Sequence, residues 1–387
     1  MRITKYVFVL IFSLFLLTNF IYLPNNSHLV AIEGDSKAYL LMEYGTGQIL
    51  KEHNAEEKLP IASVTKLMTL LLTFQEIEKG NLNYDQVLIA SKNASGMGGS
   101  QVFIDENSGY TVKDLITAVV VSSANDASVV LAETISGDEK TFVEKMNNKA
   151  ESLNMTKTHF SNATGLPNNE HYSCAKDVAI LMRELLNYDD YYNFSNIWMQ
   201  DFVHPSGRIT QMSNTNKLLK SYKGCDAGKT GSTNEAGFCL SASAKRNNMR
   251  LISVVLGATN SKLRFQQCSE LFDWGFNNYK SIYLINKNTE LPVTAKITRA
   301  NTNQIKIISK TDYCDIVKNG EKSNLEVHYE LNAITAPIDT NTIIGQAIIV
   351  KDGVVVDKIN LYPSENIPSI TYSDSINKVL EYWKIKK

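Results

Sequence analysis

The segment LPIASVTKLMTLLLTFQEIEKG, residues 59–80, combines a helical pattern with a candidate nucleophile. Its apolar side chains recur at helical spacing, at Leu67, Leu70, Leu71 and Phe74. Gly80 follows the last of them and is typical of a helix end. We therefore predict a helix from Ser63 to Lys79. Residues three positions apart share one side of a helix, so Lys66 lies one turn from the Ser63 hydroxyl.

Strand and helix patterns occur in blocks on either side of this segment. An apolar run with two glycines, Tyr39–Leu50, predicts a strand and a tight turn, and strand-like runs return at Phe238–Ala244 and Leu251–Gly257. Between them lie helical patterns, at 111–121, 126–135, 140–153 and 176–186. The first opens with capping-box spacing at Thr111 and Asp114. Strands at both ends of a helical block indicate an α/β domain whose sheet joins the two ends.

The composition changes from Ile282 onward, where residue types common in catalysis become sparse. Short β-prone runs lie at 293–300, 303–309, 325–331, 343–351 and 354–361. They predict a small β domain that ends near Pro363. The last segment, Ser375–Lys387, places apolar residues on one helical face and lysines elsewhere. Such a helix lies on a membrane surface, or else it packs on its own domain or is frayed, and the sequence leaves these alternatives open.

The N-terminus has the two parts of a secretory signal. Arg2 and Lys5 flank the start of an apolar stretch, 6–17, and Ala31 is the best candidate for the end of the signal. An uncleaved anchor is the alternative, although a full span needs about 20 mostly apolar residues and polar residues at 18–19 interrupt the run. The signal predicts export to the cell wall or the outer face of the cytoplasmic membrane.

Composition excludes several classes of protein. With 43% hydrophobic residues the 387-residue chain is not disordered, and its length fits two domains. It has 39 Lys plus Arg against 40 Asp plus Glu, so no basic surplus exists to bind nucleic acid. Five cysteines without a C-x-x-C pair and six histidines without an H-x-x-x-H pair predict neither a metal site nor a cofactor.

Three short motifs occur in order: Ser63-Val-Thr-Lys66, Ser123-Ala-Asn125 and Lys229-Thr-Gly231. S-x-x-K also begins at Ser173 and Ser375, but neither of these heads a complete ordered triple. Between the first and third motifs, S-x-N recurs at Ser91 and Ser152. Ser152 lies inside a helical run, whereas Ser123 lies in a polar break between helices, where a side chain can face a cleft. Spacing alone does not exclude Ser91.

The three motifs supply the parts of a serine acyl-transfer site. A serine hydroxyl is a poor nucleophile until a base removes its proton, and Lys66 lies within one turn of Ser63. The N–H groups at a helix start help to stabilise an oxyanion. Lysine acts as a base only when burial or a nearby cation lowers its pKa, and Lys229 supplies such a cation. K-T-G before a strand-like segment suggests an edge strand that presents donors to an extended peptide.

Beyond the triple, the sequence resembles the serine penicillin-recognising enzymes, and specifically the low-molecular-mass penicillin-binding proteins that act as D-alanyl-D-alanine carboxypeptidases. The resemblance extends over most of 39–276 and includes the motifs Leu59–Thr69, Thr111–Leu115, Ser123–Ala127, Thr164–Leu166, His171–Ser173, Asn214–Leu219 and Glu235–Cys239. It implies a penicillin-binding-protein/β-lactamase-like transpeptidase domain, α/β (α+β), with a helical cluster packed on an antiparallel sheet and followed by a small all-β domain. The resulting division is a signal peptide at 1–31, a catalytic domain at 32–280, the β domain at 281–365 and an amphipathic helix at 369–387.

The resemblance also implies roles for individual residues. Ser63 is the acylated nucleophile, Lys66 its proton acceptor and Ser123 the relay to the departing amine. The residues implied to bind substrate are Asn125, Lys229, Thr230, Gly231, Ser232 and Arg264. Among these, Asn125 holds the substrate amide, Lys229 and Thr230 meet the terminal carboxylate, and Arg264 orients it. The Ser63 and Ser232 N–H groups form the oxyanion hole. The implied partners are peptidoglycan stem peptides and β-lactams, which act as covalent inhibitors.

Two alternatives to a carboxypeptidase remain. A class A β-lactamase shares the triple but needs a glutamate in an E-x-x-x-N arrangement, and the nearest candidate, Glu184-Leu-Leu-Asn187, is one residue short. A non-catalytic wall-binding or regulatory protein is the other alternative, and intact motifs argue against it. Three stretches depart from the family pattern, at Asn162–Gly165, Cys174 and Asp226–Gly228. They affect loop shape and substrate preference rather than the core chemistry.

Overall fold

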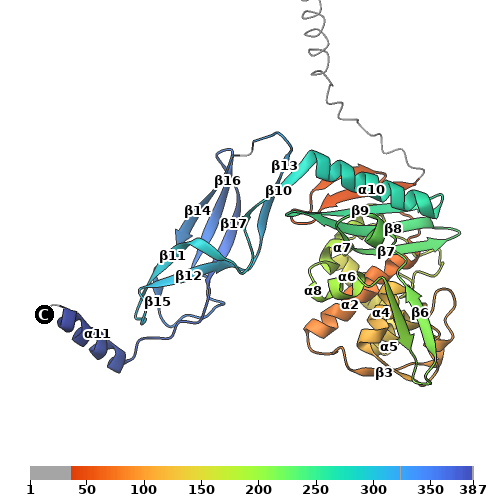
Figure 1. The fold of residues 1–387 in the computed structure, drawn as a ribbon, viewed down its shortest axis with the longest axis horizontal. Helices are drawn as coiled ribbons and strands as arrows, with labels where there is room; N and C mark the ends of the chain where they lie inside the picture. Colours follow the sequence, from red (N-terminus) through yellow and green to blue (C-terminus); the bar gives the residue numbers. More distant parts are fainter. Residues whose placement is uncertain (1–35, 323, 386–387) are drawn as a thin grey trace, which may run out of the picture. The chain divides into compact units, whose positions relative to one another are not determined.

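A computed structural model describes residues 36–322 and 324–385 (Figure 1). The predicted signal peptide at 1–31 lies outside the described residues. No helix among those described is long and apolar enough to cross a membrane.

One five-stranded antiparallel sheet organises the first part of the chain, with strand order β2-β1-β9-β8-β7. Its strands are β1 (Ala38–Glu43), β2 (Ile49–His53), β7 (Cys225–Thr233), β8 (Gly237–Arg246) and β9 (Met249–Ala258). β1 pairs with β9, with Leu40 opposite Val254, so the sheet joins both ends of the domain as predicted. β7 is an edge strand, as predicted. The K-T-G motif lies within this strand rather than ahead of it.

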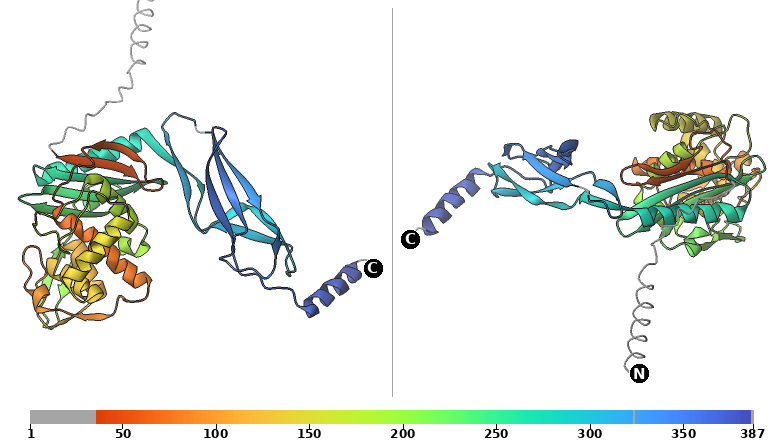
Figure 2. Two further views of the ribbon diagram at one scale, coloured as in Figure 1. Left: turned by 180° about the vertical axis from the view of Figure 1, so that it is seen from behind. Right: turned by 90° about the horizontal axis from the view of Figure 1, so that it is seen from above.

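Helices cover both faces of this sheet (Figures 1 and 2). One face carries a cluster comprising α2 (Lys66–Glu78), α4 (Val112–Val121), α5 (Asn125–Ser136), α6 (Glu139–Ser152), α7 (Ala175–Leu185) and α8 (Asp189–Ser195). The other carries α10 (Ser261–Asn278), which Figure 1 shows opposite the cluster. Helix α10 was not predicted from the sequence. Its buried face includes Arg264, Gln267 and Gly275, so the apolar stripe that marks a helix in sequence is interrupted.

The helix predicted over Ser63–Lys79 is divided in two. A 3₁₀ turn, η1, spans Ala62–Thr65, and the α-helix α2 starts at Lys66. Ser63 therefore lies in the tight turn and not in the α-helix itself. The helix start predicted at Thr111 is confirmed, since the Thr111 hydroxyl accepts from the Asp114 N–H at 3.1 Å. The Asp114 carboxylate accepts from the same hydroxyl at 2.6 Å. The short elements α3 (Lys92–Ser95) and α9 (Leu218–Ser221), and two hairpins outside the main sheet, were not predicted. The hairpin strands are β3 (Val87–Ile89), β4 (Gly109–Thr111), β5 (Met199–Val203) and β6 (Ile209–Ser213).

The C-terminal part is rich in strands, as predicted. A six-stranded sheet has the order β14-β16-β17-β12-β11-β15, and β10 pairs separately with β13. The bounds are β10 (Tyr279–Ile285), β11 (Glu290–Thr298), β12 (Gln304–Ser309), β13 (Tyr313–Lys318), β14 (Leu325–Leu331), β15 (Ile334–Thr335), β16 (Gly345–Lys351) and β17 (Val354–Pro363). A separate apolar core, with Ile307, Ile349 and Leu361 fully buried, holds these strands together. Helix α11 (Tyr372–Ile385) follows, with Val379 and Leu380 about half exposed.

Candidate active site

The three sequence motifs meet at one place in the fold. Ser63 and Lys66 come from η1 and the start of α2, Ser123 from the junction of α4 and α5, and Lys229 from β7. The Lys66 Nζ lies 2.9 Å from the Ser63 Oγ, and the Lys229 Nζ lies 2.7 Å from the Ser123 Oγ. A Cβ on Gly231 would fall 2.9 Å from the Ser63 nitrogen, and the charge of Lys229 acts on Lys66, so the two serine–lysine pairs belong to one site. That site is built from segments that are far apart in the chain.

The backbone at Ser63 is held tightly. Ala62 adopts φ +47°, a left-handed conformation that is unfavourable for a residue with a side chain. Two glycines flank the Ala62–Ser63 peptide. A Cβ on Gly165 would fall 1.9 Å from the Ala62 carbonyl oxygen, and one on Gly231 would fall 2.9 Å from the Ser63 nitrogen. Both positions therefore require glycine, and the close contact with the Ser63 backbone explains why the third residue of K-T-G is a glycine.

Lys66 has the environment of a base. Its side chain is fully buried, and its Nζ donates to the Thr164 carbonyl at 2.6 Å. Burial, then the nearby charge of Lys229, holds the pKa of Lys66 well below its usual value, and Asp126 acts in the opposite direction. A lysine in this setting can take a proton from the hydroxyl beside it.

Ser123 adopts φ +60° at the break between two helices. Its side chain is buried against Lys229, which also donates to the Thr230 carbonyl at 2.9 Å. Burial, then the charge of Arg264, lowers the pKa of Lys229 to about 7. Because that ammonium titrates near neutrality, its charge depends on pH in the range where enzymes work.

Asn125 begins α5 and is tied to the loop that precedes α4. Its Nδ2 donates to the Gly98 carbonyl at 2.6 Å, and its backbone N–H donates to the Ser100 carbonyl at 2.7 Å. The neighbouring Asp126 carboxylate accepts from the Val102 N–H at 3.1 Å. Asn125 is therefore fixed in position through its backbone N–H and its amide nitrogen.

The edge strand β7 presents the remaining candidates. The Thr230 hydroxyl donates to Thr215 at 2.7 Å, and Ser232 is exposed. Within the described residues no strand pairs with the outer edge of β7. An extended peptide can add to such an edge by backbone hydrogen bonds.

Arg264 lies in α10, nearly buried, where its Nη1 donates to the Gly231 carbonyl at 3.0 Å and to the Cys239 carbonyl at 3.3 Å. Its guanidinium also stacks near Phe238 and Phe265. These contacts hold β7 and β8 from one side. Its Nε has no partner among the described groups.

Two contributors to the site were not among our candidates. The Thr164 carbonyl receives the Lys66 ammonium, and Gly165 makes room for the Ala62 carbonyl. Both belong to Thr164–Leu166, which the sequence resemblance already included. The Thr164 carbonyl is a backbone group that any residue provides, and the glycine at 165 does not by itself show which peptide it contacts. Among the described residues, no cluster of His, Cys, Asp and Glu could hold a metal ion.

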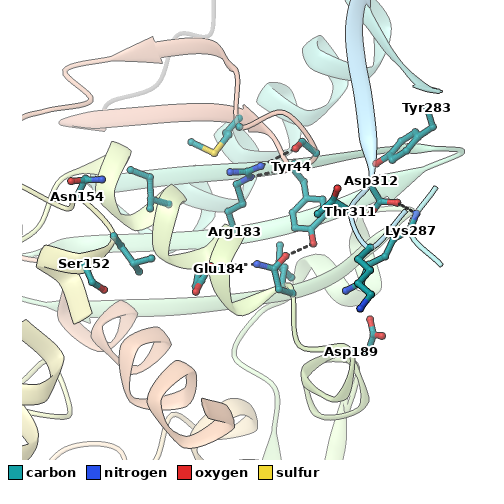
Figure 3. Close-up of a pocket in the computed structure, with 18 residues that line it drawn as sticks. Tyr44, Ser152, Asn154, Arg183, Glu184, Asp189, Tyr283, Lys287, Thr311 and Asp312 are labelled. Carbon is teal, nitrogen blue, oxygen red and sulfur yellow. Dashed lines mark hydrogen bonds between the residues drawn. The ribbon is translucent and has the colours of Figure 1, made fainter. Parts of the chain in front are cut away.

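The glutamate considered for a β-lactamase lies elsewhere. Glu184 lines a cavity of about 760 Å³ (Figure 3). Other residues that line this cavity include Tyr44, Arg183, Asn187, Lys287 and Asp312. None of our candidate site residues lines it. Glu184 pairs there with Lys149 at 3.1 Å, and Arg183 donates to the backbone carbonyl of Gly45 at 2.8 Å.

The fold and the paired serines and lysines define the class of serine penicillin-recognising enzymes. Residues 25–260 match the family described as D-alanyl-D-alanine carboxypeptidase, and residues 279–369 match the C-terminal domain of penicillin-binding protein 5. The chain belongs to the D-alanyl-D-alanine carboxypeptidase family. It is a serine-type carboxypeptidase and a penicillin-binding protein, and the predicted family and fold class are confirmed.

Similar proteins cover nearly the whole chain. The D-alanyl-D-alanine carboxypeptidase DacF of Bacillus subtilis is 35% identical over 90% of both chains, and DacC of Escherichia coli is 30% identical over 86% of this chain and 84% of its own. Penicillin-binding protein 5 of Haemophilus influenzae has a similar structure, with a TM-score of 0.67 and 30% identity over 87% of this chain and 98% of its own.

Proposed function

We propose that Ser63, Lys66 and Ser123 perform the chemistry by which this carboxypeptidase removes the terminal D-alanine from peptidoglycan stem peptides. Lys66 takes the Ser63 proton as Ser63 Oγ attacks the penultimate carbonyl carbon. The C–N bond then breaks, and Ser123 relays to the leaving amine the proton that Lys66 took from Ser63, which restores neutral Lys66. Water subsequently cleaves the ester on Ser63. The observation that carries this proposal is the 2.9 Å distance between the Lys66 Nζ and the Ser63 Oγ. Lys66 is buried, and burial lowers its pKa so that it can accept a proton.

We place the substrate along the edge of β7. Its free carboxylate meets Lys229 and Thr230, its scissile carbonyl oxygen accepts from the Ser63 and Ser232 N–H groups, and Asn125 holds its amide. Gly231 lets the strand approach Ser63. Arg264 attracts the carboxylate by its positive charge. Its Nη1 donates to the Gly231 carbonyl, so it also holds in position the strand β7 that binds the carboxylate.

The direct test is intact mass of the purified protein after brief exposure to benzylpenicillin, together with D-alanine release from a diacyl-D-Ala-D-Ala peptide. We expect a long-lived penicilloyl adduct and D-alanine release. Rapid penicillin turnover without an adduct would favour a β-lactamase. Neither adduct nor release would favour a non-catalytic wall protein.

The pKa of Lys229 predicts how activity depends on pH. The ammonium loses its charge as pH rises through about 7, so kcat/KM for the peptide is expected to fall above that pH. In Lys229→Arg the cation stays charged, so this alkaline fall should disappear even if the maximal rate is lower. The measurement is D-alanine release between about pH 5 and 10. Lys223→Arg, at an exposed lysine, is the control and should keep the wild-type profile. If kcat/KM of Lys229→Arg still fell above about pH 7 as in the wild type, that fall would belong to the titration of another group.

We further propose that the protein acts outside the cytoplasm, exported by the signal predicted at 1–31, and that its chain divides into a catalytic domain at 32–280, a β domain at 281–365 and the C-terminal helix at 369–387. The two separate family matches and the separate apolar core of the C-terminal strands support the division.

Helix α11 is proposed to lie on the membrane surface. Its apolar residues Ile376, Val379 and Leu380 remain 43%, 54% and 48% exposed, so its own domain does not cover them. We expect the purified protein lacking the signal to sediment with vesicles that contain anionic lipid, and the variant Val379→Glu/Leu380→Glu to stay in solution. The control Val354→Glu/Val356→Glu alters exposed valines of β17 and should leave sedimentation unchanged. Equal sedimentation of both double variants would contradict the proposal.

A further inference from the structure

A buried chain of hydrogen bonds links His171 to the backbone of the nucleophile. The Ser161 N–H donates to His171 Nδ1 at 3.1 Å. His171 Nε2 lies 2.7 Å from the Thr65 hydroxyl oxygen, and that hydroxyl donates to the Ala62 carbonyl at 2.8 Å. His171 is 4% exposed and Thr65 is fully buried, so water does not compete for these bonds.

The partners determine the direction of every bond in this chain. A backbone N–H can only donate, so His171 Nδ1 carries no proton and Nε2 carries one. Thr65 has a single hydroxyl proton, which goes to Ala62, so its oxygen accepts from His171 Nε2. The ring must be neutral for this arrangement. Burial, then the charges of His159 and Lys66, lowers the pKa of His171 to about 4, which keeps the ring neutral at neutral pH.

The carbonyl at the end of the chain belongs to the strained residue before Ser63. Ala62 holds φ +47° because its surroundings impose it. Gly165 and Gly231 leave room for the Ala62–Ser63 peptide, but neither offers a side chain to hold it. The Thr65 hydroxyl is a side-chain donor to its carbonyl, and it is oriented by His171.

We propose that His171 is a positioning residue that, through Thr65, holds the Ala62–Ser63 peptide so that the Ser63 N–H faces the oxyanion and the Ser63 Oγ stays beside Lys66. This inference rests on the proposed roles of Ser63 and Lys66. The expected loss is in acylation and not in substrate binding, because the carboxylate contacts at Lys229 and Thr230 belong to β7, on a separate segment.

Two substitutions with amide side chains test the two hydrogen bonds of the His171 ring separately. The amide nitrogen of Gln reaches the position of Nε2, so His171→Gln keeps a donor for Thr65. The amide oxygen of Asn reaches only the position of Nδ1, so His171→Asn keeps an acceptor for Ser161 but loses Thr65. We expect His171→Asn to lower kcat for D-alanine release and the benzylpenicillin acylation rate by at least about tenfold, with KM changed less than about twofold. His171→Gln should recover most of the rate.

Thr65→Val tests the same chain without changing His171. It should lower kcat to a similar extent. The kcat of the double variant Thr65→Val/His171→Asn should be little lower than that of either single variant, because both substitutions interrupt the same chain of hydrogen bonds. His204→Asn is the matched control: His204 is 2% exposed and its Nε2 lies 2.9 Å from a threonine hydroxyl, that of Thr210. It should lower the melting temperature in the manner of His171→Asn but leave the acylation rate within about twofold.

Three results would overturn the inference. They are a near-wild-type rate in His171→Asn, an equal loss in His171→Gln and His171→Asn, or losses in Thr65→Val and His171→Asn that simply add. Failure of the wild-type protein to form an adduct or to release D-alanine would overturn the proposed function instead, so the two failures are distinguishable.

Discussion

Ser63→Ala is expected to abolish both the penicilloyl adduct and D-alanine release, with a fall in rate of at least about 10⁴-fold. The reason is that the substitution removes the atom that we propose forms the covalent bond, and no other hydroxyl pairs with Lys66 in the described part of the chain. Intact mass after benzylpenicillin treatment measures the adduct, and a D-alanine assay measures release. The melting temperature should change little, since Ser63 is partly exposed and its hydroxyl is small.

Ser375→Ala is the control for this experiment, because Ser375 heads another S-x-x-K pattern. That variant should form the adduct as the wild type does. A penicilloyl group retained in Ser63→Ala, at any other serine, would contradict the assignment of the nucleophile.

Lys66→Met is expected to lower the acylation rate by about 10²- to 10⁴-fold without unfolding the protein. Methionine fills much of the same buried space but cannot accept the Ser63 proton. It leaves the Thr164 carbonyl without its 2.6 Å donor, yet it also removes an ammonium whose burial is costly. The measurements are the benzylpenicillin acylation rate and the melting temperature at several pH values.

The pH dependence of stability supplies a second readout for Lys66→Met. In the wild type, burial lowers the pKa of Lys66 in the folded state below its unfolded value. The unfolded chain therefore binds more protons, so this lysine reduces the free energy of unfolding as pH falls from about 10 toward the folded pKa. Lys66→Met should lose that contribution and show a smaller fall in melting temperature over the same range.

Lys113→Met, at an exposed lysine of α4, is the control and should keep the wild-type rate and the wild-type pH dependence of stability. A Lys66→Met variant that acylates within tenfold of wild type would contradict the role of Lys66 as base.

Much of the secondary structure followed from local sequence patterns. The N-cap at Thr111, the helices α5, α6 and α7, and strands such as β14 lie close to their predicted positions, because the local preference of each segment agrees with the packing of the domain. The prediction was wrong for the start of the helix at Ser63, where a 3₁₀ turn replaces the first α-helical turn. Contacts of Gly165 and Gly231 with the Ala62–Ser63 peptide shape this turn, and they come from distant segments.

Sequence alone determined which residues we propose for the chemistry, because the order of S-x-x-K, S-x-N and K-T-G and the three-residue spacing of Ser63 and Lys66 are properties of the chain. Tertiary structure decided the rest. It joined Lys229 to Ser123, buried Lys66 and Lys229 so that their pKa values fall, and placed Arg264 beside the Gly231 carbonyl. It also brought His171 to Thr65, a contact 106 residues apart in sequence. Burial and long-range contacts arise only when the elements pack, so no local pattern records them.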